Sequence, residues 1–130
     1  LRTRVTSTWP GATLTSRVQT GSPLSYAVAG INQYKPTVDV LVVSSGANNL
    51  LSSTIASDLR TALDATDGAR CVVWATVSER IYGNTAATPT YGTAAQWKAG
   101  AKTFNETLRA EAARRPNLHV ADWAPIVTAS

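Results

Sequence analysis

A three-layer α/β/α fold built on a parallel sheet is the class that this sequence predicts. Short runs of β-branched and apolar residues alternate along the chain with segments whose apolar residues recur at helical spacing. Alternation of this kind gives a parallel sheet wrapped on both faces by right-handed crossovers. The 130 residues have the length of one domain and contain neither a linker nor an internal repeat. We therefore expect residues 1–130 to form a single domain.

The apolar run at residues 38–45 organises the rest of the chain. Only Asp39 interrupts it, near its start, so we interpret it as a strand buried on both faces. A second buried strand is predicted at residues 70–77, and shorter strands at residues 1–8 and 118–121.

Three helices are predicted between these strands from their end signals and apolar spacing. They lie between Ser22 and Pro36, between Ser53 and Gly68, and between Thr93 and Pro116. Ser22 is a hydroxyl N-cap followed by proline, and Thr93 with Gln96 forms a capping box. A long polar loop at residues 78–90 precedes the third helix, and loops of this length are usually functional or mobile.

Charge and cysteine content limit the classes of function. The net charge is +4, but the basic residues are scattered rather than gathered into a stripe, so we expect no nucleic-acid partner. The single Cys71 excludes an internal disulfide and is expected to be a small buried apolar residue.

No stretch is apolar enough to predict a membrane span. The absence of an initiator Met and of a signal-peptide core suggests a processed form or a fragment.

Residues with chemical potential follow the predicted strands. Gly11 and Asn48 lie beyond strand ends on the same predicted edge, and a backbone N–H with a side-chain amide can form an oxyanion hole. Asn48 and Asn49 could instead merely cap the next helix. Asp122 ends the last strand, where it could orient a base or bind a substrate hydroxyl, or cap the following turn. His119 is expected to be a packed residue rather than a general base.

Motifs for cofactors and metals are missing from the sequence. There is no GxGxxG after a strand, no P-loop, no HExxH and no GxSxG elbow. We therefore expect neither a metal nor a cofactor.

Three segments resemble the SGNH (GDSL-type) hydrolase family. Trp9-Pro-Gly-Ala-Thr-Leu14 resembles the family's second block, whose glycine donates a backbone N–H to the oxyanion. Val40-Leu-Val-Val-Ser-Ser-Gly-Ala-Asn-Asn49 resembles the third block, Gly-x-Asn-Asp, whose asparagine is the other oxyanion donor. Arg115-Pro-Asn-Leu-His-Val-Ala-Asp-Trp123 resembles the strand and Asp-Trp turn before the last block.

The resemblance implies a flavodoxin-like parallel sheet and an ester hydrolase, lipase or carbohydrate O-acyl esterase. It places Gly11 and Asn48 in the oxyanion hole, and Asn49 and Asp122 beside the substrate. Asn49 departs from the block's usual Asp, which puts the hydrogen bonding at that position in doubt. The Gly-Asp-Ser block with the nucleophile has no counterpart in the sequence. The Asp-x-x-His block is not matched either, because Pro125 stands three residues after Asp122.

Three functions remain open on this basis. The first is part of a serine ester hydrolase acting on a small-molecule, carbohydrate or lipid ester, in a secreted or cell-envelope setting. The second is a catalytically inactive SGNH-like domain that binds a partner. The third is an unrelated flavodoxin-like domain whose asparagines contact a phosphate or sugar. The sequence does not specify an oligomeric state.

Overall fold

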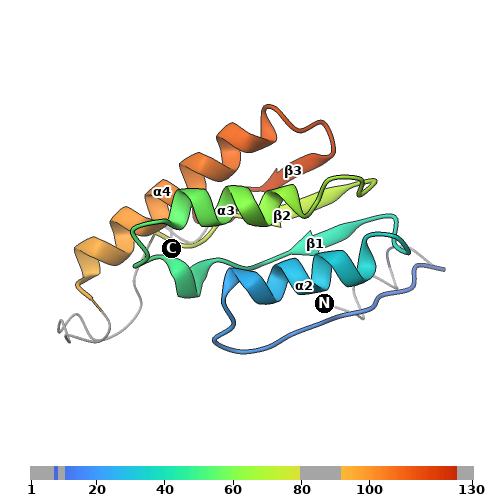
Figure 1. The fold of residues 1–130 in the computed structure, drawn as a ribbon, viewed down its shortest axis with the longest axis horizontal. Coiled ribbons are helices and arrows are strands. Elements are labelled where there is room, and N and C mark those ends of the chain that lie inside the picture. The colour runs from blue at the N-terminus through green and yellow to red at the C-terminus, as the bar shows by residue number, and fades with distance from the viewer. Residues whose placement is uncertain (1–7, 9–10, 80–91, 126–130) are drawn as a thin grey trace.

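A three-stranded parallel sheet lies at the centre of the computed structural model, which describes residue 8, residues 11–79 and residues 92–125 (Figure 1). The strands are β1 (Leu41–Val43), β2 (Val72–Ala75) and β3 (Leu118–Ala121), in the order β1-β2-β3. The predicted α/β class and three of the four strands are confirmed. The strand predicted at residues 1–8, apart from Thr8, and most of the loop predicted at residues 78–90 lie outside the described residues.

Three helices pack side by side against one face of this sheet (Figure 1). They are α2 (Leu24–Tyr34), α3 (Ile55–Asp64) and α4 (Ala94–Ala112), and a short 3₁₀ turn, η1 (Ala47–Asn49), follows β1. Each connection between strands steps in the same direction across the sheet, so right-handed crossovers place their helices on the same face. Within the described ranges no helix combines the length and apolarity needed to cross a bilayer.

The predicted helix starts are confirmed in part. In α4 the Gln96 N–H donates to Thr93 Oγ1 at 3.2 Å, and the Thr93 N–H donates to Gln96 Oε1 at 2.7 Å, as the capping box predicts. The N-cap of α2 is Pro23, which has no side chain able to cap, and not the predicted Ser22. The side chain of Asn49, which follows β1, caps this helix instead.

The core lies between the sheet and its helices. Strand side chains that point toward the helices are buried, with Val72 and Trp74 at 0% exposure. Across from them, Leu59 of α3 and Phe104 and Leu108 of α4 are also fully buried. Burial of large side chains such as these supplies about 1.5–3 kcal/mol each, so this single interface stabilises the described fold.

No described helix lies against the opposite face of the sheet (Figure 1), and this corrects the prediction that the strand at residues 38–45 is buried on both faces. Leu41 and Val43 are buried, but Val42 between them is 72% exposed and Val40 is 51% exposed. The strand register places Val42, Val73 and His119 in one row on this side. We call this side the open face; alternation along the strands assigns to it Val40, Val42, Cys71, Val73, Ala75, His119 and Ala121.

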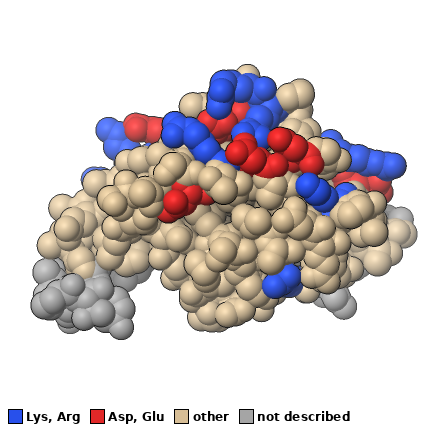
Figure 2. All heavy atoms as spheres, in the orientation of Figure 1, with Lys and Arg blue, Asp and Glu red and all other residues tan. Residues whose placement is uncertain are grey.

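A buried carboxylate joins the ends of α3 and α4. The side chain of Glu111 is only 3% exposed and accepts hydrogen bonds from Arg60, Arg114 and Arg115. Arg115 also pairs with Asp64 of α3. Figure 2 shows charged side chains gathered on the α3 and α4 side of the molecule, whereas the α2 side carries few. On the face that this view shows, the charged side chains therefore gather over α3 and α4.

Candidate functional site

The three strands end at a common edge of the sheet, where the predicted site residues Asn48 and Asp122 follow β1 and β3. Ligands of open α/β sheets bind outside the carboxyl ends of the strands. We call the segments that follow the strands here, residues 44–54, 76–79 and 122–125, the carboxyl edge. It is the candidate site.

Gly46 sets the direction of the chain after β1. Its φ of 124° lies in a region that residues with a Cβ rarely adopt. A Cβ added there would stand 2.3 Å from Cε2 of Phe104 in α4, so only glycine fits at this approach. This contact fixes η1, and with it Asn48 and Asn49, against α4.

Asn48 and Asn49 both bond to the segment that begins α2. The Asn48 Nδ2 donates to the carbonyl oxygen of Ser22 at 3.2 Å, and the Leu24 N–H donates to Asn49 Oδ1 at 2.9 Å. Asn49 therefore caps α2, the helix that precedes β1 in sequence. The alternative that the pair caps the following helix is wrong, since neither side chain bonds to the start of α3 and Thr54 occupies its N-cap.

Gly11 is exposed and has a φ of 95°, and an added Cβ would meet nothing within 4 Å. The chain before α2 runs back along that helix (Figure 1). Arg17 in this segment stacks on the Tyr26 ring at 4.2 Å and donates to Gln33 Oε1 at 3.1 Å. Asn48 bonds to Ser22, at the end of this segment where α2 begins, and the segment leads from there away from Asn48 toward Gly11. The described contacts thus do not bring Gly11 and Asn48 together.

Asp122 forms an ion pair with Arg109 of α4. Its carboxylate accepts from Arg109 Nη2 at 2.7 Å and Nε at 3.2 Å, and from Thr76 Oγ1 at 3.2 Å. The hydrogen bond from Arg109 lowers the pKa of Asp122, burial opposes this shift, and Thr76 contributes in the same direction as Arg109. Among the described residues, the N–H groups of Trp123 and Ala124 that follow Asp122 donate to Thr76 Oγ1, at 2.8 and 2.9 Å, and not to the Asp122 carboxylate.

Asn105 is a buried polar residue that the sequence analysis did not select. It is 0% exposed, its amide bonds both the N–H and the carbonyl of Val77 at 2.9 Å, and its Nδ2 also reaches Glu79 at 3.1 Å. It thereby fixes the chain as it leaves β2. Its spacing, four residues after Ala101 and three before Leu108 on the apolar stripe of the helix, is the signal that could have revealed it.

Two further expectations are corrected by burial. His119 is exposed on the open face rather than packed, because no described helix lies against the row that it shares with Val42 and Val73. Cys71 is half-buried and not fully buried, for the same reason. Within the described part of the chain, no group of His, Cys, Asp or Glu side chains could hold a metal ion.

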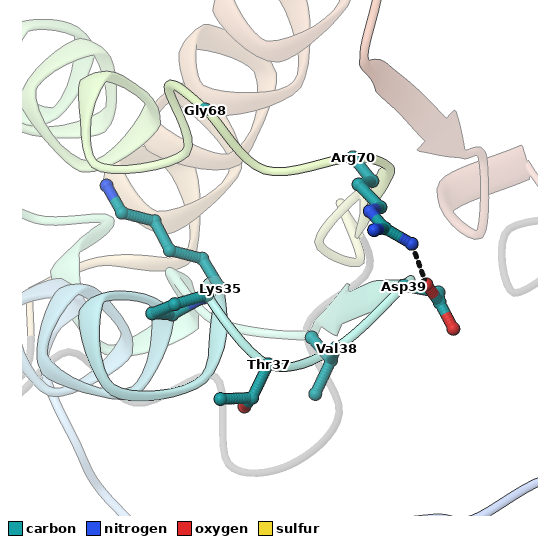
Figure 3. A pocket seen from close by; sticks show the side chains of 7 residues that line it. Lys35, Thr37, Val38, Asp39, Gly68 and Arg70 are labelled. Atoms are coloured by element: carbon teal, nitrogen blue, oxygen red, sulfur yellow. Dashed lines mark hydrogen bonds and ion pairs between the residues drawn. The ribbon is translucent and has the colours of Figure 1, made fainter.

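A shallow hollow lies at the amino ends of β1 and β2, between the segments that lead into these strands (Figure 3). It is lined by Lys35, Pro36, Thr37, Val38, Asp39, Gly68 and Arg70. The cations on its rim already have partners: Lys35 Nζ donates to the carbonyls of Ala65 and Asp67 at 3.0 and 3.2 Å, and Arg70 pairs with Asp39 at 2.5 Å. The hollow therefore offers no free cation to a ligand.

Comparison with known proteins yields no match: no family model, no curated protein and no solved structure resembles the chain.

Proposed function

We propose that this chain is part of an SGNH-type serine ester hydrolase, to which it contributes an oxyanion-hole donor. The substrate is a carbohydrate, lipid or other small-molecule ester. The proposal rests on the resemblance of residues 40–49 to the third block of that family and on the position of this block in the fold.

One observation carries the proposal: Asn48 stands on a rigid turn at the carboxyl end of a parallel strand. Gly46 has the backbone conformation and the close approach to Phe104 that make it irreplaceable, so the turn holds one shape. An oxyanion hole needs donors fixed before the negative charge develops. The Asn48 amide has two N–H groups, and Ser22 takes one, which leaves the other for a substrate oxygen.

The remaining site residues have weaker support. The role of Gly11 rests on the resemblance alone, because its contacts do not lead to Asn48. Asn49 and Asp122 are engaged with Leu24 and with Arg109, so either would contact substrate only beside those bonds. A nucleophilic Ser and a general-base His are not assigned, since their blocks have no counterpart in the sequence.

We also propose that the sheet is part of a three-layer, flavodoxin-like arrangement. Parallel sheets are normally covered on both faces, and the open face is apolar. No described strand pairs with the outer edge of β1 either. A sheet that continues past β1 and a second helical layer would bury both surfaces.

The test is hydrolysis of 4-nitrophenyl acetate by this polypeptide and by the same polypeptide extended at both ends. We expect turnover by the extended protein only, and a fall in kcat of about 10²–10³ in its Asn48→Ala variant. Asn32→Ala, on the exposed surface of α2, is the matched control and should leave kcat unchanged.

Turnover by neither polypeptide contradicts the proposal and favours a catalytically inactive binding domain of the same fold. Binding of a flavin or nucleotide to the 130-residue chain would favour the unrelated flavodoxin-like domain instead. Equal kcat values for Asn48→Ala and the unsubstituted protein would refute the role given to the Asn48 amide.

A further inference from the structure

The indole of Trp74 joins β2 to the turn that carries Asn48. Trp74 is buried at 0% exposure, and its Nε1–H donates to the carbonyl oxygen of Ser45 at 3.2 Å. Ser45 directly precedes Gly46, whose φ of 124° directs the chain into η1. The indole therefore acts on the peptide group between Ser45 and Gly46.

This contact begins where the backbone pairing of β1 with β2 ends. The last pair in the register is Val43 with Trp74, and Ser45 lies two residues further along the chain. Among the described residues, no backbone hydrogen bond links Ser45 to β2. The indole N–H therefore takes the place of the ladder as the tie between β2 and the start of the turn.

Helix α4 holds the same turn by close packing. Phe104 lies against Gly46 at the beginning of the turn. At its end, a Cβ added to Gly100 would stand 1.8 Å from the carbonyl oxygen of Leu50, so only glycine admits this approach. Van der Waals contacts of this kind limit where the turn lies, but they are not directional. A hydrogen bond is directional, so the indole sets the orientation of the peptide group that leads into the turn.

We propose that Trp74 is a positioning residue for the Asn48 amide: by holding the Ser45 carbonyl, it fixes the turn from which Asn48 projects. The inference rests on the proposed function of Asn48 as an oxyanion-hole donor, which it deepens. Trp74 acts only through the turn, because a side chain with no exposed surface does not reach a substrate. Precise placement matters in catalysis, since a shift of about 1 Å can lower the rate by about 10²-fold.

Two signals in the 130-residue chain report the state of this turn without any enzymatic activity. The first is the side-chain amide resonance of Asn48 in heteronuclear NMR spectra, because its Nδ2 is hydrogen-bonded. The second is hydrogen exchange of the Leu24 N–H, which donates to Asn49 Oδ1 on the same turn. Exchange of the Gln96 N–H, in the capping box of α4, is the internal reference.

Trp74→Phe removes the donor and keeps an aromatic ring in the core. We expect the Leu24 N–H to exchange about tenfold faster relative to that of Gln96, which corresponds to the loss of a single hydrogen bond. The Asn48 amide resonances should shift as well. Leu63→Ala is the matched control, because Leu63 is also fully buried and lies at the end of α3 that leads into β2, away from the turn. It should change neither the exchange ratio nor the Asn48 resonances.

The effect on catalysis is measured in the protein extended at both ends. There Trp74→Phe should lower kcat for 4-nitrophenyl acetate about tenfold and leave KM nearly unchanged, because the side chain acts on the donor and not on the bound ester. Leu63→Ala should leave kcat unchanged. A role confined to stability would not separate kcat from KM in this way.

A second variant removes the indole N–H without changing the size of the side chain appreciably. Native chemical ligation at Cys71 joins residues 1–70 to a synthetic segment of residues 71–130. In that segment 3-benzothienylalanine, which has sulfur in place of the indole N–H, replaces Trp74. This full-length chain should show the faster Leu24 exchange and the shifted Asn48 resonances, and it decides the question if Trp74→Phe does not fold.

The inference is overturned if the benzothienylalanine chain folds with the Leu24 exchange and Asn48 resonances of the unsubstituted protein, or if Leu63→Ala changes both signals equally. Full kcat in the extended Trp74→Phe protein would also overturn it. Absence of turnover by the unsubstituted extended protein refutes the proposed function instead. In that case the NMR signals of the 130-residue chain still decide whether Trp74 holds the turn.

Discussion

Replacing Gly46 by alanine tests the turn on which the candidate site depends. The new Cβ would stand 2.3 Å from Cε2 of Phe104, and the backbone would keep a φ of 124°. Backbone strain of this kind costs about 1–3 kcal/mol. Overpacking costs about 1–3 kcal/mol more. The lower entropy of the unfolded alanine chain offsets about 0.4–1 kcal/mol of this.

We therefore expect Gly46→Ala to lower the free energy of unfolding by about 1–6 kcal/mol. Urea unfolding followed by fluorescence measures it, because Trp74 is fully buried. Gly68→Ala is the matched control: its φ is 82° but an added Cβ meets nothing within 4 Å, so it reports the strain without the clash. The difference between the two variants is the cost of the contact with Phe104.

A second substitution, Phe104→Leu, separates the cost of the Cβ contact with Phe104 from the cost of the positive φ at residue 46. In a protein that already carries Phe104→Leu, the additional cost of Gly46→Ala should fall toward that of Gly68→Ala. The reasoning is refuted if Gly46→Ala and Gly68→Ala cost the same, or if the effects of the substitutions at Gly46 and Phe104 are simply additive.

Three further predictions concern buried or capping polar groups. Asn105→Ala leaves the N–H and carbonyl of Val77 without their partner, so the free energy of unfolding should drop by about 2–4 kcal/mol in urea titrations. Asn49→Ala removes the cap on the Leu24 N–H and should cost about 1 kcal/mol, with lost protection of that amide in hydrogen exchange; unchanged exchange would contradict the cap. Burial raises the pKa of Glu111, but hydrogen bonds from its arginine partners outweigh this and lower the pKa overall. Its contribution to stability should be present above the unfolded pKa of about 4.3 and be lost as pH falls through the lower folded value. In urea unfolding at several acid pH values, Glu111→Gln should make the free energy of unfolding depend less steeply on pH. An unchanged pH dependence would contradict this role of Glu111.

Local signals in the sequence predicted the regular elements well. The valine-rich runs gave β1 and β2, and Thr93 with Gln96 gave the start of α4, because such signals act between residues close in sequence. The burial of Val42 was predicted wrongly, since an apolar run cannot reveal whether a second layer covers the strand.

The contacts of the site were harder to predict because they join distant segments. Asn49 reaches back 25 residues to cap α2, and Asp122 pairs with Arg109 on a helix that precedes its own strand. A single sequence shows the residue types at these positions but not the register that brings them together. Asn105 was missed for the same reason, although its helical spacing from Ala101 and Leu108 was visible in the sequence.

The outer edge of β1, with which no described strand pairs, has a consequence for aggregation. Val40-Leu-Val-Val43 is an uncharged, β-prone segment whose main chain can template another strand, which is the pattern of an aggregation hazard. Asp39 and Arg70, 82% and 79% exposed, stand at the start of this edge as gatekeepers. We expect replacement of both residues by alanine to lower the concentration at which the protein aggregates, as measured by light scattering.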